Sequence, residues 1–455
     1  MEQVTEKLCE RIVALGHDDL GEAAIAKAQQ LFLDGLAVAV AGTVQETPPS
    51  VLAAHVRELG GAETATVIGF GFKTNPVQAA YVNGSSMHVL DFEPMWSPAN
   101  HQLSTQLPAA LALAEHHGGD GRDVATAMVK GIELMGWLRE ASGQYDATVV
   151  RFHPPGQVGP LGAAVTAAHM LGLDRDQLVN AIAIAGSRAG SLLANAGTDT
   201  KSTHCGLACA MGLDAAMLAA RGFSGNRRVL EDDRGYAALF FGLDVFRFEL
   251  MERYGPPWRV VDPGYAIKMF PSQFGTHFVI TAGLELHPRI QDPERIRRVH
   301  IAGPPMHYVN RPRPETGLAG KFSFQYTAAC ALLDGKVVMS SFEDAHRFAP
   351  RMERLLDKIT VDMRADIPGR FEEMYVDMEV ELDDGTTLST RCHGPRGKWG
   401  LAPITVDEHL VKVRDCLGLR LSSRDVERVI ELGSNLTRLG NAELREVMAI
   451  VARAE

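Results

Sequence analysis

Signatures of several common functional classes are missing from this chain of 455 residues. Its six cysteines are scattered, with no compact Cys-x-x-Cys pair, so we expect reduced thiols rather than disulfides or an iron–sulfur cluster. Its formal net charge of −11 offers no basic stripe to nucleic acid. No uninterrupted apolar run of about 18 residues predicts a membrane span, and the polar, acidic residues 1–6 do not resemble a signal peptide. We therefore expect a cytoplasmic protein that binds neither nucleic acid nor membranes.

Signatures of bound cofactors are missing as well. Gly69-Phe70-Gly71 lacks the third glycine and the strand-to-helix setting of a dinucleotide fingerprint, and there is no Gly-Lys-Ser/Thr phosphate loop. Cys205 and Cys209 are one helical turn apart, which fits either a metal pair or two small residues in a helix interface; we favour packing. The sequence therefore predicts neither a cofactor nor a metal.

The composition that is present, 46% apolar and 22% charged, is typical of a globular protein with a large core. Apolar residues recur at helical spacing through the first 265 residues and again from about residue 406, and we expect no strands in the first part. Asp174 and Gln177 form a cap-like start, and Pro108 fits the first turn of its helix. The helices are predicted over residues 22–41, 108–116, 124–140, 161–171, 178–184 and 206–220.

The pattern changes between residues 290 and 402. Residues 374–382 alternate between apolar and mostly acidic side chains, a turn follows at 383–385, and residues 386–391 return, which predicts a β-hairpin with one buried face. Short strands are also predicted at 299–302 and 359–361, and a helix at 324–333. The predicted fold class is therefore mainly α. A large all-helical domain, residues 1–265 completed by 403–455, carries a smaller inserted α+β domain, residues 266–402.

The segment Asp91-Phe-Glu-Pro-Met-Trp-Ser-Pro-Ala-Asn-His101 places a carboxylate, an indole and an imidazole between two predicted helices. Its two prolines fix φ and remove backbone donors, so the segment cannot be ordinary helix. Loops that a rigid scaffold holds in place often carry site residues. Taken alone, the segment fits either a capped turn or a catalytic loop.

Four further segments accompany it in a fixed order: Phe152-His-Pro-Pro-Gly156, Thr198-Asp-Thr-Lys-Ser-Thr-His204, Ile267-Lys-Met-Phe-Pro271, and Ser323-Phe-Gln-Tyr326 followed by Leu332-Leu-Asp-Gly335. Together the five segments make nearly the whole chain resemble the MmgE/PrpD family. That family includes 2-methylcitrate dehydratase, cis-aconitate decarboxylase and an iminodisuccinate epimerase. Residues 96–101, 152–155 and 308–312 bring the resemblance closest to the decarboxylase branch. The resemblance implies the same two-domain layout, with the smaller domain as a lid, and a homodimer.

A lyase that acts on polycarboxylates must hold carboxylates, stabilise a carbanion, and move a proton near neutral pH. The resemblance implies that two lysines hold the carboxylates, two histidines transfer protons, an aspartate orients a histidine, and a tyrosine closes over the substrate. These catalytic candidates are Lys201, Lys268, His101, His153, Asp91 and Tyr326. Without the resemblance they fit a solvated loop lysine, a snorkelling lysine, structural histidines, a helix cap and a buried tyrosine.

Four further residues are substrate-binding candidates: Met95, His204, Gln273 and Arg311. His204 follows Lys201 closely, and the Arg311 guanidinium offers a bidentate fork to a carboxylate. Met95 and Gln273 stand where the family pattern has a threonine and the decarboxylase branch a histidine, and a thioether cannot donate the hydrogen bond of a hydroxyl. The leading hypothesis is a cofactor-independent lyase for a small polycarboxylate, resembling cis-aconitate decarboxylase. A 2-methylcitrate dehydratase-like hydro-lyase, an epimerase of a dicarboxylate and a non-catalytic helical scaffold are the alternatives.

Overall fold

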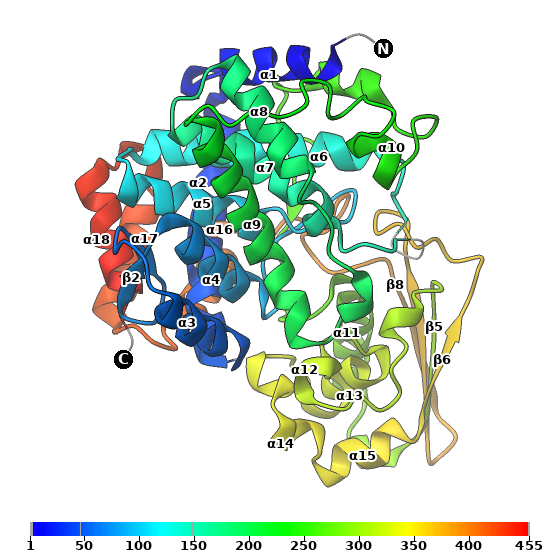
Figure 1. The fold of residues 1–455 in the computed structure, drawn as a ribbon. Coiled ribbons are helices and arrows are strands. Elements are labelled where there is room, and N and C mark those ends of the chain that lie inside the picture. The colour runs from blue at the N-terminus through cyan, green and yellow to red at the C-terminus, as the bar shows by residue number, and fades with distance from the viewer. Residues whose placement is uncertain (1–2, 46, 147–149, 454–455) are drawn as a thin grey trace.

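The structure is a computed structural model that describes residues 3–45, 47–146 and 150–453. It is mainly α, as predicted. In Figure 1 the helices of the first half of the chain, blue to green, gather in one body, and α12–α15 lie with the strands β5, β6 and β8 beside it. Two separate clusters of buried apolar side chains correspond to these two regions.

The first cluster is built by long helices, several of which are buried along most of their length. They are α1 (Val4–Ala14), α2 (Gly21–Gln45), α3 (Thr47–Leu59), α4 (Pro76–His88), α5 (Leu103–His116), α6 (Gly121–Ala141), α7 (Pro154–Met170), α8 (Arg175–Gly186) and α9 (Asp199–Ala219). Small residues let α4 and α9 approach closely, because a Cβ on Gly84 would lie 2.7 Å from the Cα of Gly206. The Asp174–Gln177 capping box at the start of α8 is confirmed.

The helix α2 is the one described helix that is long and apolar enough to cross a membrane. Two thirds (67%) of its most apolar stretch is buried inside the protein, against α4, α16 and their neighbours. Because its apolar side chains already have protein partners, we interpret α2 as the central helix of the first core.

The second cluster joins helices to a four-stranded sheet of order β6-β5-β7-β8. β5 (Ile296–Gly303) pairs in parallel with β6 (Ile359–Met363) and antiparallel with β7 (Val376–Leu382), which pairs antiparallel with β8 (Thr387–Cys392). The predicted hairpin with one buried face is confirmed, since alternate residues of β7 are buried. The helices of this region are α11 (Phe274–Leu286), α12 (Gly317–Gly320), α13 (Phe324–Asp334), α14 (Asp344–Arg347) and α15 (Pro350–Leu356).

The last three helices return to the first cluster. α16 (Val406–Leu417) and α17 (Ser423–Gly433) pack on α2, and α18 (Asn441–Val451) packs on α5. Figure 1 shows α17 and α18, in orange and red, next to the blue helices of the N-terminal half. Ser422 caps α17 by accepting the backbone N–H of Asp425.

Two sequence-based predictions about the first 265 residues were wrong. That part also contains short strands: β1 (Ala65–Val67) pairs with β2 (Phe72–Thr74), and β3 (Met95–Trp96) pairs with β4 (Tyr265–Ala266), beside the second core. Helix α5 begins at Leu103, five residues before the predicted start, so Pro108 lies inside it. The reason is a distant cap: the carboxylate of Glu93 accepts the backbone N–H of Ser104 in the first turn.

Two more helices begin at residues that were predicted to be loop. α7 begins at Pro154, directly after His153, because prolines are favoured in the first turn of a helix. α9 begins at Asp199, so Lys201 lies in its first turn rather than in a polar loop. Both corrections place predicted site residues on rigid helix ends.

Candidate active site

Asp91 lies in the loop between α4 and α5 and gathers two lysines. Its φ of 51° is a left-handed conformation that residues other than glycine rarely adopt. Lys201 Nζ donates to Asp91 Oδ2 at 2.7 Å, and Lys268 Nζ donates to Oδ1. Burial alone would raise the pKa of Asp91, but the two ammonium groups outweigh it and lower this pKa well below its usual value. Asp91 is therefore a fixed, buried carboxylate.

Lys268 uses all three of its N–H groups on the protein. Besides Asp91 Oδ1, its Nζ donates to the carbonyl of Asp91 at 2.8 Å and to that of Ser272 at 3.0 Å. A lysine ammonium has three protons, and this side chain is completely buried. The structure thus places Lys268 behind Asp91, contrary to the prediction that it holds a substrate carboxylate directly. Burial lowers the pKa of Lys268 to about 8.

Lys201 is bound differently. Its Nζ donates to Asp91 Oδ2 and lies 2.8 Å from Nε2 of His88, and the described residues offer it no third acceptor. Its side chain lines a cavity, where Nζ is 5.1 Å from the ring centroid of Phe322. One N–H of Lys201 therefore stays available to a ligand.

His101 and His153 line the same cavity, with ring centroids 5.9 Å apart. Nε2 of His101 is 3.6 Å from Asp91 Oδ1, too long for a hydrogen bond but close enough for Asp91 to act on its charge. Burial lowers the pKa of both imidazoles well below the usual value, and Lys201 adds to the effect. Without a ligand, both rings therefore favour the neutral form.

Sequence reasoning missed His88 and Glu93. Nδ1 of His88, the last residue of α4, is 2.7 Å from Oε1 of Glu93, and Glu93 also accepts from the hydroxyl of Ser104 at 2.6 Å. Burial raises the pKa of Glu93 to about 7, against the opposing hydrogen bonds from Ser104, and lowers that of His88 well below its usual value. The pattern His88-x-x-Asp91-x-Glu93 was the available signal, because it places three titratable side chains at one helix end.

The cavity receives side chains from both regions of the molecule. His101, His153 and Lys201 come from the first region, while Gln273, Tyr308, Phe322 and Phe371 come from the second. Nε2 of Gln273 donates to the hydroxyl of Tyr308 at 2.8 Å, and no described residue accepts the proton of that hydroxyl, so it is available to a ligand. Met95 supplies an apolar patch. Two predicted substrate-binding positions, Met95 and Gln273, thus line the cavity, and Tyr308 is a further polar residue that we did not predict.

Besides Lys268, three predicted residues do not line this cavity. The hydroxyl of Tyr326 donates to the carbonyl of Ser341 at 2.5 Å and lies beside His346, within the second core. His204 lies behind His153, with the two Nδ1 atoms 3.2 Å apart, and burial lowers its pKa to about 4.

Arg311 is the third. It donates to the carbonyls of Tyr308 at 2.9 Å and Ala196 at 2.7 Å, so it supports the wall of the cavity from outside. The resemblance, the nearness of His204 to Lys201 and the guanidinium of Arg311 suggested these three residues, but the contacts of each are made outside the cavity.

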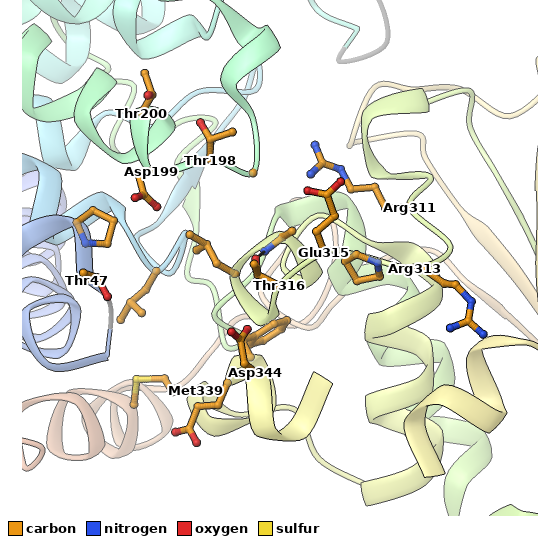
Figure 2. A pocket seen from close by; sticks show the side chains of 18 residues that line it. Thr47, Thr198, Asp199, Thr200, Arg311, Arg313, Glu315, Thr316, Met339 and Asp344 are labelled. Atoms are coloured by element: carbon orange, nitrogen blue, oxygen red, sulfur yellow. Dashed lines mark hydrogen bonds between the residues drawn. The ribbon is translucent and has the colours of Figure 1, made fainter. Parts of the chain in front are cut away.

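A larger cleft of about 1060 Å³ lies on the other side of Arg311 (Figure 2). The start of α9 forms one wall, and residues 311–319 with 339–344 form the opposite wall. Four carboxylates line it, from Asp199, Glu315, Glu343 and Asp344, against only two guanidinium groups. Arg313 is already paired with Glu353 and Asp357. This acidic cleft is a poor site for a polycarboxylate, and we place the candidate active site at the smaller cavity.

Among the described residues, two groups of side chains are close enough to share a metal ion: His88 with His101 and His153, and His88 with Glu93 and Cys205. In the first group, Nε2 of His88 already accepts a hydrogen bond from Nζ of Lys201. In the second, the Cys205 thiol is buried, which raises its pKa well above the usual value and disfavours the thiolate that binds metals. Adjacent ammonium groups also repel a divalent cation, so the donor set fits a metal poorly.

Buried imidazoles beside a fixed carboxylate and one available ammonium form a site that suits acid–base chemistry, on a mainly helical fold. The sequence matches the family described as MmgE/PrpD N-terminal domain over residues 6–249, and MmgE/PrpD C-terminal domain over residues 270–438. The chain belongs to the MmgE/PrpD family, and the predicted resemblance is confirmed.

Relatives with assigned names match almost the full chain. The protein is 32% identical over 451 residues to a cis-aconitate decarboxylase of Mus musculus, which covers 96% of this chain and 92% of that protein. It is 31% identical over 450 residues to a cis-aconitate decarboxylase of Homo sapiens, and that match covers 96% of this chain and 93% of the human protein. A 2-methylcitrate dehydratase of Escherichia coli (strain K12) is 25% identical over 429 residues, and that match covers 84% of this chain and 83% of the bacterial protein.

Proposed function

We propose that this protein is a cofactor-independent lyase that decarboxylates a small unsaturated polycarboxylate such as cis-aconitate. The observation that supports this most is the available N–H of Lys201 in a cavity that His101 and His153 also line. The similarity to two proteins named cis-aconitate decarboxylase, over nearly the full chain, supports the same reaction.

The geometry suits the steps of a decarboxylation. One carboxylate of the substrate binds Lys201, and another lies toward Tyr308 and Gln273. The C–C bond to the leaving carboxylate breaks, carbon dioxide departs, and the electron pair stays on carbon, delocalised into the adjacent double bond and carboxylate. The ammonium of Lys201 stabilises that charge.

His101 and His153 then supply the proton that the carbanion needs. Both imidazoles are neutral without a ligand. A polyanion that enters the cavity raises the pKa of the imidazoles that face it, so one of them takes up a proton as substrate binds. That imidazolium delivers the proton to carbon, and Asp91, 3.6 Å from His101, favours the charged form of the ring.

We further propose that residues 266–402 act as a lid over the first region. They hold their own apolar core, and they contribute Gln273, Tyr308, Phe322 and Phe371 to the cavity wall. Because the other wall comes from the first region, separating the two would open the cavity to substrate. The homodimer and the cytoplasmic location stay predictions.

The test is turnover of a panel of acids, followed by proton NMR and by carbon dioxide release. We expect cis-aconitate, or a close unsaturated analogue, to lose one carboxylate as carbon dioxide. Water loss from 2-methylcitrate without carbon dioxide would instead support the dehydratase alternative. Solvent deuterium exchange without net loss would support the epimerase. A parent protein that consumes none of these acids would contradict the proposal.

A further inference from the structure

Lys201 contacts His88, and His88 in turn contacts Glu93; the proposed chemistry uses neither of these two buried side chains directly. Oε1 of Glu93 is 2.7 Å from Nδ1 of His88, and Nε2 of the same ring is 2.8 Å from Nζ of Lys201. Glu93 is fully buried and His88 is 1% exposed, and neither lines the cavity. These two contacts connect the carboxylate of Glu93, the imidazole of His88 and the ammonium of Lys201 in that order.

The two neighbours of His88 fix where its proton lies. A lysine ammonium is only a donor, so Nε2 of His88 must accept from Lys201. A neutral imidazole carries one proton, which therefore lies on Nδ1 and is donated to Glu93. Burial, followed by the charge of Lys201, lowers the pKa of His88 well below its usual value, in agreement with a neutral ring.

This arrangement sets the direction of the remaining N–H of Lys201. Its three N–H groups are tetrahedrally disposed, and acceptors on Asp91 and His88 fix two of them. The third direction is then determined, and the side chain lines the cavity. With His88 lost or reversed, one fixed point remains and the ammonium can rotate.

We propose that Glu93 and His88 are positioning residues that aim the free N–H of Lys201 at a carboxylate of the substrate. The part that concerns the substrate rests on the proposed function. The part that concerns the His88 proton is a property of the enzyme without ligand, so it is tested independently.

The variant Glu93→Gln separates this role from simple packing. The backbone N–H of Ser104 needs an acceptor at 2.9 Å, so the amide oxygen of the glutamine must face Ser104. The amide nitrogen then faces Nδ1 of His88 as a donor, and the His88 proton must move to Nε2. There it opposes the ammonium of Lys201 and removes one of its acceptors.

The experiment is nitrogen-15 NMR of the full-length protein labelled at its sixteen histidines, recorded without ligand at pH 8 and combined with steady-state kinetics. The variant His88→Gln identifies the His88 signals by their loss. We expect Nδ1 to carry the proton in the parent and Nε2 to carry it in Glu93→Gln. We expect kcat/KM of Glu93→Gln to fall by up to about a hundredfold, as for a misplaced catalytic group.

Ser104→Ala is the matched control, because it removes a donor to Glu93 but leaves the carboxylate and its bond to His88. Its His88 proton should stay on Nδ1. Should Glu93→Gln fail to fold, His88→Gln keeps an acceptor for Lys201 and should retain more kcat/KM than His88→Leu.

A His88 proton on Nε2 in the parent would overturn the proposal, as would a Glu93→Gln enzyme with parental kcat/KM or an active His88→Leu enzyme. A parent with the proton on Nδ1 but without turnover of any acid would contradict the proposed function and leave the His88 arrangement supported.

Discussion

Two buried clusters in this protein contain the same three residue types, but only one of them borders the cavity. Asp34 on α2 accepts from Lys412 at 2.9 Å and from His409 at 3.0 Å, both on α16. Lys412 also donates to the second oxygen of Asp34 at 3.1 Å and to the carbonyl of Phe92 at 2.8 Å. Three acceptors therefore surround its three protons, as they do for Lys268. Lys201 has only two acceptors among the described residues, so one of its N–H groups stays available. This available donor, rather than the residue types, distinguishes the candidate active site from the other cluster.

The largest effect should come from breaking the cluster of Asp34, His409 and Lys412, in which every proton of the lysine ammonium has an acceptor. Lys412→Met leaves Asp34, whose pKa its partners lower in spite of burial, with His409 alone. Removing one partner of a buried ion pair typically costs about 3–5 kcal/mol, and we expect that loss in the free energy of unfolding measured with denaturant. Adding Asp34→Asn should recover much of it, since no buried charge then lacks a partner. A loss below about 1 kcal/mol, typical of a surface pair, would mean that the cluster contributes little.

Lys201→Met should show the opposite profile, with a large loss of turnover and a smaller loss of stability. Asp91 keeps Lys268 as a partner, so the fold retains a compensated carboxylate. Loss of a positioned donor to a developing charge typically costs about a hundredfold to a thousandfold in kcat. Kinetics and denaturant unfolding of the same preparation test both halves. A variant that keeps more than about a tenth of the parental rate would contradict the assignment of Lys201.

The pH dependence of turnover also separates the two clusters, because the groups around the cavity include two whose pKa lies near neutrality. As pH falls through about 7, Glu93 gains a proton and loses the charge that holds the His88 proton on Nδ1. As pH rises through about 8, Lys268 loses its proton, and Asp91 loses one of its two cations. We expect kcat/KM, which reports the free enzyme, to be highest between these values. Glu93→Gln should remove the acid limb, and a flat parental profile across this window would contradict both assignments.

The smallest effect distinguishes the two tyrosines. Tyr326→Phe removes one hydrogen bond within the second core, typically worth about 0.5–1.5 kcal/mol of stability, and should leave turnover unchanged. Tyr308→Phe removes the free hydroxyl proton at the cavity and should lower turnover. Thermal unfolding and kinetics of the pair make the comparison. Loss of turnover in Tyr326→Phe alone would restore the original prediction.

The sequence predicted the helices and the hairpin well, because their apolar periodicity is strong. It predicted that Asp91, His101, His153 and Lys201 would lie together, through the family resemblance. It could not show that all three protons of the Lys268 ammonium have acceptors within the protein, since two of these acceptors are backbone carbonyls that no side-chain pattern reveals. Nor could it place Tyr308 ahead of Tyr326, because both lie in family-like segments and only the fold decides which side chain faces the cavity.

The contact between Lys412 and the carbonyl of Phe92 also has a consequence for how the protein is made. The loop that contains Asp91 is synthesised early, yet one of its supports comes from a helix 320 residues later in the chain. The peptide after Asp91 gains this contact only once α16 has left the ribosome and docked on α2. A nascent chain, or a product of proteolysis that ends before residue 406, would carry every cavity-lining side chain without that support. Completion of the chain is thus coupled to completion of the loop that holds Asp91.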